Sequence, residues 1–398
     1  MSRTRKQRRR RGPRLKIPEM LIDALGTLEG GELSRPEQVT RIAEGVKAIH
    51  RGLTVDRRRW MGGGYMAHKA QGAAYGTYYL CANLPKLWPI LDRMAHRGLI
   101  KAGALKILEV GGGPGTGTFA AALWAQARGW PLPTVHLTDI QRDPLSRARA
   151  LWKAMGWPAE LLTTATVDLT QPLTGQVARS GFDLALACNV FNEIETAHDE
   201  RALPEIAALL KPTGCLVSVE PAVRELSRRA LALRDTAVEK GWRVVMPCTH
   251  QGPCPALEDE RDWCHGEWNF ERPDFMAEVD RRVGTRREVL KATWWVATPP
   301  RHPGVSSLSV PEGLRPARVV SERFDQKGRT ALVVCDLEGR RRLELQRRDA
   351  GPDNAPFGLA VRHDLLALPP GTEGRLSPDT PVIALAEVPD SSDTDESL

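Results

Sequence analysis

A glycine-rich segment in the first half of the chain has the composition of a nucleotide-binding loop. It reads EVGGGPGTG from Glu109 to Gly117 and follows a short apolar run at 105–110. Glycine lets the backbone turn sharply and approach a ligand closely, and a helix that begins here presents free N–H groups. The segment therefore predicts a loop that holds a nucleotide-type ligand between a buried strand and a helix.

Acidic residues follow at the ends of the next two apolar runs, with Asp139 after 134–137 and Asp168 after 164–167. The carboxyl ends of parallel strands meet at one edge of a sheet, so we expect these acids beside the loop. A dinucleotide site and a plain strand–helix turn are the alternatives, but Glu109 would repel a pyrophosphate and suits a cationic amino acid. The set resembles motif I and the following acids of class I S-adenosylmethionine-dependent methyltransferases. That resemblance implies a cofactor site made by Glu109, Gly111, Gly113, Gly115, Asp139 (ribose hydroxyls) and Asp168 (adenine edge).

The segment after the fourth apolar run, 184–187, is where such enzymes place the methyl acceptor. It reads Asn-Val-Phe-Asn-Glu from Asn189 to Glu193. Enzymes that methylate exocyclic amino groups usually carry Asn/Asp-Pro-Pro-aromatic there, and both prolines are missing here. Asn189, Asn192 and Glu193 are the candidate catalytic residues. Cys188 is a conceivable nucleophile, although a small buried cysteine commonly serves packing.

Three cysteines gather in a later segment, Cys248, Cys254 and Cys264, and a metal site there needs a fourth ligand. His250 or His265 would complete a zinc site of mixed ligands. The distant Cys335 would complete four thiolates suited to an iron–sulfur cluster and would pin the end of the chain to the preceding domain. Three unrelated cysteines in a loop are the remaining alternative. Because 248–291 looks too poor in apolar residues to fold alone, we expect a metal to hold it.

The elements that must position these residues alternate between strand and helix from 105 to 246. This order predicts an α/β fold of the class I methyltransferase type, with a mostly parallel, doubly wound sheet. Helical spacing at Val39, Ile42, Val46 and Ile49 predicts a helical region before it, and Asp336-Leu337-Glu338-Gly339 predicts a hairpin in a β-rich end. The expected organisation is a disordered Arg-rich tail (1–16), a helical region (17–100), the methyltransferase domain (101–298) with the cysteine insertion (248–291), a linker (299–314), a small β-rich domain (315–388) and a disordered acidic tail (389–398).

The charge is concentrated at the start of the chain. Residues 1–16 hold nine Lys and Arg and no acid, whereas the remainder holds 47 basic and 49 acidic residues. Such a block favours a polyanion, of which RNA is the first candidate; a solubilising tail and a targeting peptide are the alternatives. The 41% apolar content suffices for a core, and no apolar run is long enough to span a bilayer or to form a secretory signal. We expect no membrane or DNA partner.

Several motifs together resemble the methyltransferase-like family of small-subunit ribosome assembly factors, known from mitochondria and bacteria. They are the stretch from Tyr75 to Pro85, the glycine loop, the cysteine segment with Pro247 and Trp263, and Val334-Cys335-Asp336. The resemblance implies S-adenosylmethionine, a 4Fe–4S cluster on Cys248, Cys254, Cys264 and Cys335, and association with the small ribosomal subunit and its rRNA. An active rRNA methyltransferase and a small-molecule methyltransferase with a structural zinc are the alternatives. The bacterial cytoplasm is the expected compartment, or the mitochondrial matrix in a eukaryote.

Overall fold

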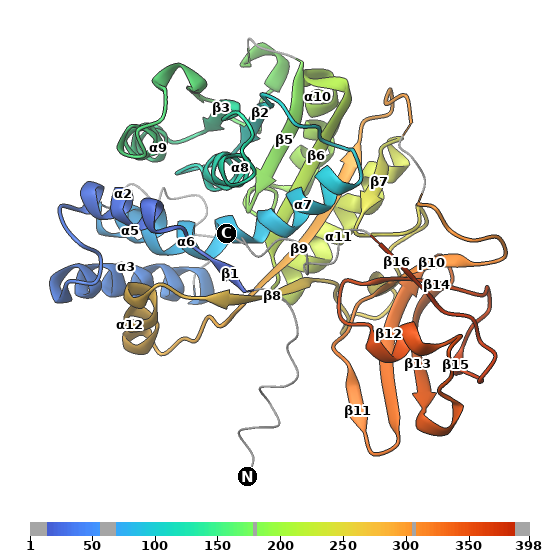
Figure 1. Cartoon of the computed structure of the whole chain (residues 1–398). Coiled ribbons are helices and arrows are strands. Elements are labelled where there is room, and N and C mark those ends of the chain that lie inside the picture. Colours follow the sequence, from blue (N-terminus) through green and yellow to red (C-terminus); the bar gives the residue numbers. More distant parts are fainter. Residues whose placement is uncertain (1–13, 56–68, 178–180, 305–307, 387–398) are drawn as a thin grey trace.

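The chain builds two β-sheets with separate cores (Figure 1). The computed structural model describes residues 14–55, 69–177, 181–304 and 308–386. The larger sheet carries the glycine loop, and the smaller sheet is formed by the residues from 315 onward. The α/β class expected from the sequence, with a helical region before it and a β-rich part after it, is confirmed.

The N-terminal helices pack on the larger sheet. Helix α3 owes its position to its apolar stripe, since Val39, Ile42, Val46 and Ile49 are all buried. The chain then enters a π-helical turn, η2 (Tyr75–Tyr79), and a 3-10 turn, η3 (Leu84–Leu87), that contains Pro85. The helices of this region are α2 (Glu19–Glu29), α3 (Pro36–Val55), α5 (Lys69–Ala74), α6 (Leu80–Asn83) and α7 (Trp88–His96).

The larger sheet has the strand order β1-β8-β9-β6-β5-β2-β3-β4, with β7 also paired to β9. From β2 the chain runs outward through β3 and β4, and from β5 it runs the other way through β6, so the order reverses between β2 and β5. Strands β2 to β6 are parallel to their neighbours in this set. A ligand crevice is expected at such a reversal, outside the carboxyl ends of the strands. The elements are β2 (Lys106–Val110), α8 (Thr116–Ala127), β3 (Thr134–Asp139), α9 (Arg142–Ala154), η4 (Ala159–Leu161), β4 (Leu162–Thr166), η5 (Leu173–Gly175), β5 (Phe182–Cys188), α10 (Thr196–Leu209), β6 (Leu210–Pro221), α11 (Arg224–Glu239) and β7 (Arg243–Met246).

The segment 248–291 corrects one expectation, because only its first part is irregular. After the turn η6 (Pro255–Leu257) it forms β8 (Gly266–Glu271), α12 (Asp274–Val283) and the beginning of β9 (Val289–Thr298). Helix α12 buries Phe275, Met276 and Val279 and contacts α3, while β9 pairs antiparallel with β6, β7 and β8. The segment therefore has apolar packing of its own, and the expectation that it is too poor in apolar residues to fold alone was wrong.

The last two residues of the tail that was expected to be disordered, 1–16, form part of a sheet instead. Leu15 and Lys16 form β1, which pairs parallel with β8 in the register Leu15↔Phe270. The next residue, Ile17, is fully buried, so the ordered chain begins before residue 17. In the ranges that the structure describes, none of the helices has the length and hydropathy to cross a bilayer.

The C-terminal sheet has the order β15-β13-β12-β10-β14-β16, and β11 pairs with β12. Its predicted hairpin is confirmed, since β12 and β13 pair up to Asp336↔Gly339. Phe357, Leu343 and Leu366 are fully buried in a core separate from that of the larger sheet. The elements are β10 (Arg315–Val319), β11 (Phe324–Gln326), β12 (Arg329–Asp336), β13 (Gly339–Gln346), η7 (Arg347–Asp349), α13 (Ala355–Leu359), β14 (Leu365–Leu368), β15 (Gly374–Arg375) and β16 (Ile383–Leu385).

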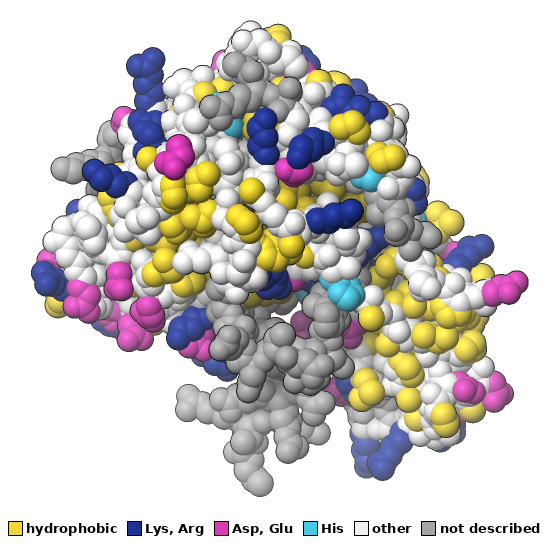
Figure 2. All heavy atoms as spheres, turned by 45° about the horizontal axis from the view of Figure 1, so that its top comes forward, with side chains coloured by type: hydrophobic (Ala, Val, Ile, Leu, Met, Phe, Trp, Pro, Cys, Tyr) yellow, Lys and Arg dark blue, Asp and Glu magenta, His cyan; other side chains and the backbone are white. Residues whose placement is uncertain are grey.

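The surface charge is mixed. Figure 2 shows Lys and Arg side chains interspersed with Asp, Glu and apolar groups over one face of the molecule. This agrees with the near balance of 47 basic and 49 acidic residues after residue 16. The strongly basic residues 3–11 lie outside the described residues, as does the acidic end from 389.

Candidate functional site

The glycine loop joins β2 to α8 through backbone that only glycine adopts easily. Gly111, Gly113 and Gly115 have φ angles of +57°, +52° and +90°, in the left-handed region that costs other residues about 1–2 kcal/mol. A Cβ at Gly111 would also lie 2.1 Å from Cγ2 of Val190. The three glycines predicted to bind a cofactor are thus required by the shape of the loop itself.

Glu109 lies beneath the loop and caps helix α8. Its Oε1 accepts a hydrogen bond from the Gly117 N–H at 2.7 Å, and its Oε2 accepts from the Thr118 N–H at 2.7 Å and the Thr118 hydroxyl at 2.5 Å. The side chain is fully buried, and this burial raises the pKa of Glu109 to about 7 against the opposing effect of those hydrogen bonds. The predicted contact between Glu109 and a cofactor remains a prediction, because the structure assigns both oxygens to the helix N-terminus.

Asp139 and Asp168 lie at the same edge of the sheet. Asp139 ends β3, and its Oδ2 accepts from the Gly113 N–H at 2.8 Å while its Oδ1 accepts from the Gln141 N–H at 2.8 Å. Asp168 follows β4 by two residues, and hydrogen bonds from the hydroxyl and N–H of Thr170 lower its pKa. Ile140 is 59% exposed. Sequence reasoning missed this apolar side chain, although its place directly after Asp139 was the available signal.

The loop after β5 holds the candidate catalytic residues in a constrained conformation. Asn189 has a φ of +59° and donates its N–H to the Val219 carbonyl at 2.8 Å. Asn192 is buried and donates its amide to Glu220 Oε2 at 2.6 Å, while Oε1 of Glu220 accepts from the Phe191 N–H at 3.0 Å. Glu193 is exposed. The structure thus fixes Asn189 and Asn192 at the end of β5 and leaves Glu193 in solvent.

Glu220, at the end of β6, is the organising group of this loop and was missed from the sequence. It is 1% exposed, and burial raises its pKa to about 8 despite the hydrogen bonds that it accepts. Cys188 ends the neighbouring strand, and burial followed by the charges of Glu109 and Glu220 raises the pKa of its thiol well above the usual value. A raised pKa disfavours the thiolate, which is the nucleophilic form of cysteine, and Cys188 packs in the core of the larger sheet.

The four predicted metal ligands come together. Cys248, Cys254 and Cys264 from the larger part and Cys335 from β12 all line one cavity at the junction of the two sheets. Burial raises the pKa of the Cys335 thiol, and the negative charge that each of the other three thiolates would carry raises it further. The chain therefore places on one cavity four sulfur atoms spread over 88 residues of sequence.

The surroundings of this cavity are basic. It is also lined by Arg234, Arg318, Arg340 and Arg362 together with His250 and His265. The Nδ1 atom of His265 is buried without a hydrogen-bond partner. Within the described ranges, no three His, Cys, Asp or Glu side chains are arranged to hold a single metal ion.

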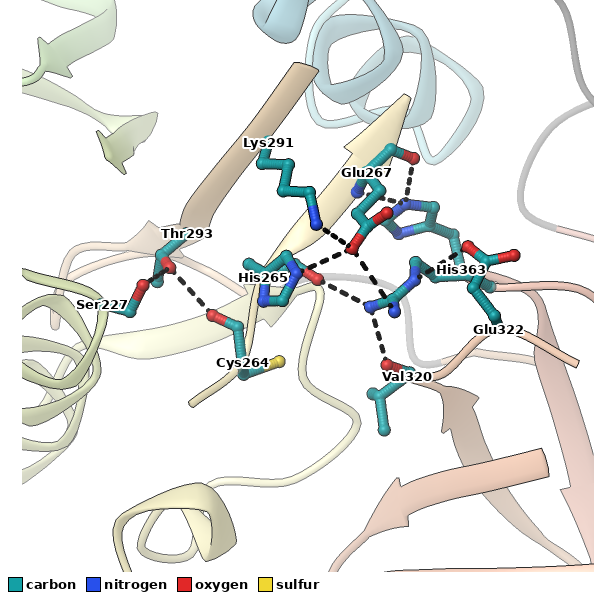
Figure 3. A network of polar contacts seen from close by, with 10 residues as sticks. Ser227, Cys264, His265, Glu267, Lys291, Thr293, Val320, Glu322 and His363 are labelled. Atoms are coloured by element: carbon teal, nitrogen blue, oxygen red, sulfur yellow. Dashed lines mark hydrogen bonds and ion pairs between the residues drawn. The ribbon is translucent and has the colours of Figure 1, made fainter. Parts of the chain in front are cut away.

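Polar contacts join the two sheets beside the cysteine cavity (Figure 3). Glu267 Oε1 receives His265 Nε2 at 2.9 Å and Lys291 Nζ at 2.8 Å, and Arg362 lies 3.7 Å away. Arg362 also donates to the His265 carbonyl at 3.2 Å and to the Val320 carbonyl at 2.8 Å. On the same side the His363 ring stacks on Trp268 with centroids 5.4 Å apart. Protein contacts thus dock the C-terminal part on the larger sheet.

The strand order, the glycine loop and the acids beside it define a methyltransferase-like Rossmann fold. Within that class, residues 69–353 match the family model described as mitochondrial small ribosomal subunit Rsm22. This match covers well over half of the 398 residues, and the chain belongs to that family. No curated protein matches the chain significantly.

Solved methyltransferase structures are similar to part of this chain at low identity. They include a ribosomal protein L11 methylase from Lactobacillus delbrueckii subsp. bulgaricus (16% identity, 42% of this chain and 73% of that one, TM-score 0.30). A TehB-like S-adenosylmethionine-dependent methyltransferase from Corynebacterium glutamicum shares 16% identity over 57% of this chain and 98% of that one (TM-score 0.32). The magnesium protoporphyrin IX methyltransferase from Synechocystis PCC 6803 shares 15% sequence identity over 64% of this chain and 96% of that one (TM-score 0.34).

Proposed function

We propose that this protein is an S-adenosylmethionine-binding, methyltransferase-like factor that acts on the small ribosomal subunit by binding its rRNA, and that it carries a 4Fe–4S cluster. The compartment is the one that holds that subunit: the bacterial cytoplasm, or the mitochondrial matrix in a eukaryote. The observation that carries the proposal is the convergence on one cavity of three cysteines from the segment between β7 and β8 and a fourth from β12, in a chain of the Rsm22 family.

The cofactor part of the proposal is supported by the order of groups along the sheet edge. Asp168 beyond β4 would meet the adenine edge, Asp139 at β3 the ribose hydroxyls, and the loop after β2 the centre of the molecule. Ile140, exposed beside Asp139, offers an apolar surface for the adenine ring. These positions match the residues that the class I methyltransferase resemblance assigns to the cofactor.

Calorimetry with S-adenosylhomocysteine, the product form of the cofactor, tests this assignment. Gly113→Val should abolish binding, because a β-branched residue is a genuine outlier at a φ of +52° and its side chain fills space that the ligand needs. Gly98→Val is the matched control, since Gly98 has a φ of +68° and a Cβ there would have no other atom within 4 Å. Unchanged affinity in Gly113→Val would refute the site.

The cluster part is supported by the donors, the space and the charge at the cysteine cavity. Four thiolates are the usual ligands of a 4Fe–4S cluster, and bound there it would covalently join the two sheets through Cys335. One water needs roughly 10–15 Å³ of cavity volume, whereas this cavity has about 50 Å³, which suits a group of several atoms. Burial raises the pKa of Cys264 and Cys335, and the charge of Arg340 opposes that rise. Arg340 thus favours the thiolate form that a metal requires.

Anaerobic purification with assays for iron, acid-labile sulfide and zinc separates the alternatives. About four iron and four sulfide per chain, lost in Cys248→Ser and Cys335→Ser, are expected. Cys215→Ala is the matched control, because Cys215 is a fully buried cysteine on β6 and does not line the cavity. One zinc and no sulfide would replace the cluster by a structural zinc site and weaken the ribosomal assignment.

The rRNA part is supported by the nine Lys and Arg residues in 1–16 and by the membership of the chain in the Rsm22 family. The logarithm of the binding constant for small-subunit rRNA should fall linearly with the logarithm of the salt concentration. Deletion of residues 1–13 should reduce that slope by roughly one for each phosphate that the tail no longer neutralises. The deletion spares β1, which begins at Leu15. An unchanged slope would remove the tail from the rRNA interface.

Methyl transfer to rRNA is the second candidate activity. The observation that favours it is the constrained loop at the end of β5, where Glu220 holds the Asn192 amide at 2.6 Å. Incubation of immature small subunits with labelled S-adenosylmethionine tests it. Label in rRNA that disappears in Asn192→Ala identifies an active enzyme, and absence of label in the wild type leaves the assembly role alone.

A further inference from the structure

Two cationic side chains, Lys86 and Arg287, come from neighbouring segments, since η3 contacts β9. Lys86, on η3, donates from Nζ to the Asn83 amide oxygen at 2.8 Å. Arg287, between α12 and β9, donates from Nε to the Tyr78 hydroxyl at 2.8 Å, and its guanidinium lies 5.3 Å and 5.5 Å from the centroids of the Tyr78 and Tyr79 rings. In the described part of the chain neither side chain forms an ion pair. Among the described residues, two N–H groups of Lys86 and the terminal nitrogens of Arg287 thus have no hydrogen-bond partner.

The mutual repulsion of these cations is unfavourable in the absence of an anion. Burial, and then the charge of Arg287, lower the pKa of Lys86 to about 7. The acid that acts on Arg287 is Asp280, which is already engaged by Arg272 Nη1 at 2.7 Å, the Tyr78 hydroxyl and the Thr285 hydroxyl at 2.8 Å. An oxyanion bound between Lys86 and Arg287 would relieve this repulsion and make charge-assisted hydrogen bonds to both.

The place of the pair along the sheet indicates which anion it meets. Lys86 lies on η3, which contacts α8, the helix that follows the glycine loop, and also contacts β9. Arg287 precedes β9, whose first residues lie at the carboxyl end of β6. The strands run in the order β4, β3, β2, β5, β6. A molecule with its adenine at β4 and its ribose at β3 therefore extends its other end past the glycine loop towards β5.

We propose that Lys86 and Arg287 form the subsite for the carboxylate at the amino-acid end of S-adenosylmethionine. The inference rests on the proposed cofactor site and names residues for a part of the ligand that the glycine loop and its acids do not reach. Arg287 presents the planar donors suited to a carboxylate, and Lys86 adds a point charge.

Calorimetry with two ligands tests the subsite. S-adenosylhomocysteine carries the amino-acid end, whereas 5′-methylthioadenosine lacks it and keeps the adenosine. Lys86→Met and Arg287→Gln should each weaken the binding of S-adenosylhomocysteine roughly tenfold or more, the usual effect of losing a hydrogen bond to a charged group. Neither variant should change the affinity for 5′-methylthioadenosine. Arg286→Gln is the matched control, since Arg286 is exposed and pairs with Glu288 at 2.7 Å.

The outcomes separate this inference from the proposed function. If the wild type binds neither ligand, the cofactor site itself is wrong. If the wild type binds both ligands, and the two variants weaken the binding of both equally or not at all, the cofactor site stands and the carboxylate subsite is refuted. If the variants weaken rRNA binding and leave S-adenosylhomocysteine unchanged, the pair serves a phosphate of the RNA instead, which also overturns the inference.

A second readout does not depend on the stability of the variants. A carboxylate bound beside Lys86 raises the pKa of that amine, so binding of S-adenosylhomocysteine near pH 8 should take up a proton. Calorimetry in two buffers of different ionisation enthalpy measures the uptake. The groups that act on Lys86 are Arg287, which stays charged, and the thiol of Cys188, which stays neutral. Uptake should vanish in Lys86→Met and with 5′-methylthioadenosine; equal uptake with both ligands would contradict the subsite.

Discussion

Substitution of Gly111 by alanine should destabilise the protein through two separable effects. The left-handed backbone, at a φ of +57°, costs alanine about 1–2 kcal/mol. The new Cβ would lie 2.1 Å from Cγ2 of Val190, far inside the normal van der Waals distance, and overpacking of this kind costs about 1–3 kcal/mol. We therefore expect Gly111→Ala to lower the free energy of unfolding by about 2–5 kcal/mol.

Equilibrium urea unfolding of the full chain, followed by tryptophan fluorescence, measures this loss. Gly129→Ala is the control for the backbone effect alone, because Gly129 has a φ of +65° and no atom within 4 Å of a Cβ; it should cost about 1–2 kcal/mol. In Gly111→Ala/Val190→Ala the contact with Cγ2 is removed and only the contact with the Cβ of residue 190, at 2.9 Å, remains. The double variant should therefore lose less than the sum of the two single variants by about 1–2 kcal/mol.

The reasoning fails if Gly111→Ala costs no more than Gly129→Ala. It also fails if the effects of Gly111→Ala and Val190→Ala add, because additivity would mean that the two side chains do not meet. Either result would show that the loop after β2 has room for a side chain and that glycine is not needed at this position for steric reasons.

Three further predictions concern buried polar groups. Burial raises the pKa of Glu220 to about 8 from 4.5, so its contribution to stability is complete below about pH 4.5 and declines as the pH rises to about 8; Glu220→Gln should flatten that decline in urea unfolding at pH 5, 7 and 9, and an unchanged slope would contradict the assignment. Arg318 is 5% exposed and donates to the Pro247 carbonyl at 2.9 Å and the His363 carbonyl at 2.7 Å, so Arg318→Met should speed limited proteolysis between the two sheets, whereas Arg315→Met, at an exposed ion pair, should not. Asp280→Asn breaks a buried pair with Arg272 and should cost about 3–5 kcal/mol; a loss below about 1 kcal/mol in urea unfolding would show that the pair is dispensable.

The alternating part of the fold was predictable because its strands are fully buried and read as apolar runs. Leu105–Val110, Thr134–Leu137 and Leu184–Ala187 coincide closely with β2, β3 and β5. By contrast, the sequence Lys-Pro-Thr-Gly at 211–214 has the composition of a turn that ends a helix, yet the structure includes it in β6. Pairing with β5, which also shows an irregular register at this point, decides the conformation there, and a single sequence does not contain that pairing.

The residue types at the site were predictable from the sequence, whereas the directions in which their side chains point were less so. The glycines of the loop follow from backbone geometry that leaves a clear mark in the sequence. Glu109 was expected to face a ligand, but the sequence does not reveal that its side chain turns under the loop to the N-terminus of α8. Lys86 and Glu220 were missed because each stands as a single polar residue in an apolar or Pro-containing stretch.

The pairing of β1 with β8 has a consequence for the order in which the molecule is completed. Leu15 lies opposite Phe270, so the first strand of the chain cannot dock until more than 250 residues behind it have been synthesised. Pairings between such distant residues form late because closing a long loop costs entropy before any attraction compensates for it. The Arg-rich segment directly before β1 therefore acquires its fixed attachment point only on a finished larger domain. A nascent or truncated chain that ends before β8 would carry the same basic residues without that anchor, so the attachment exists only in a chain that extends through β8.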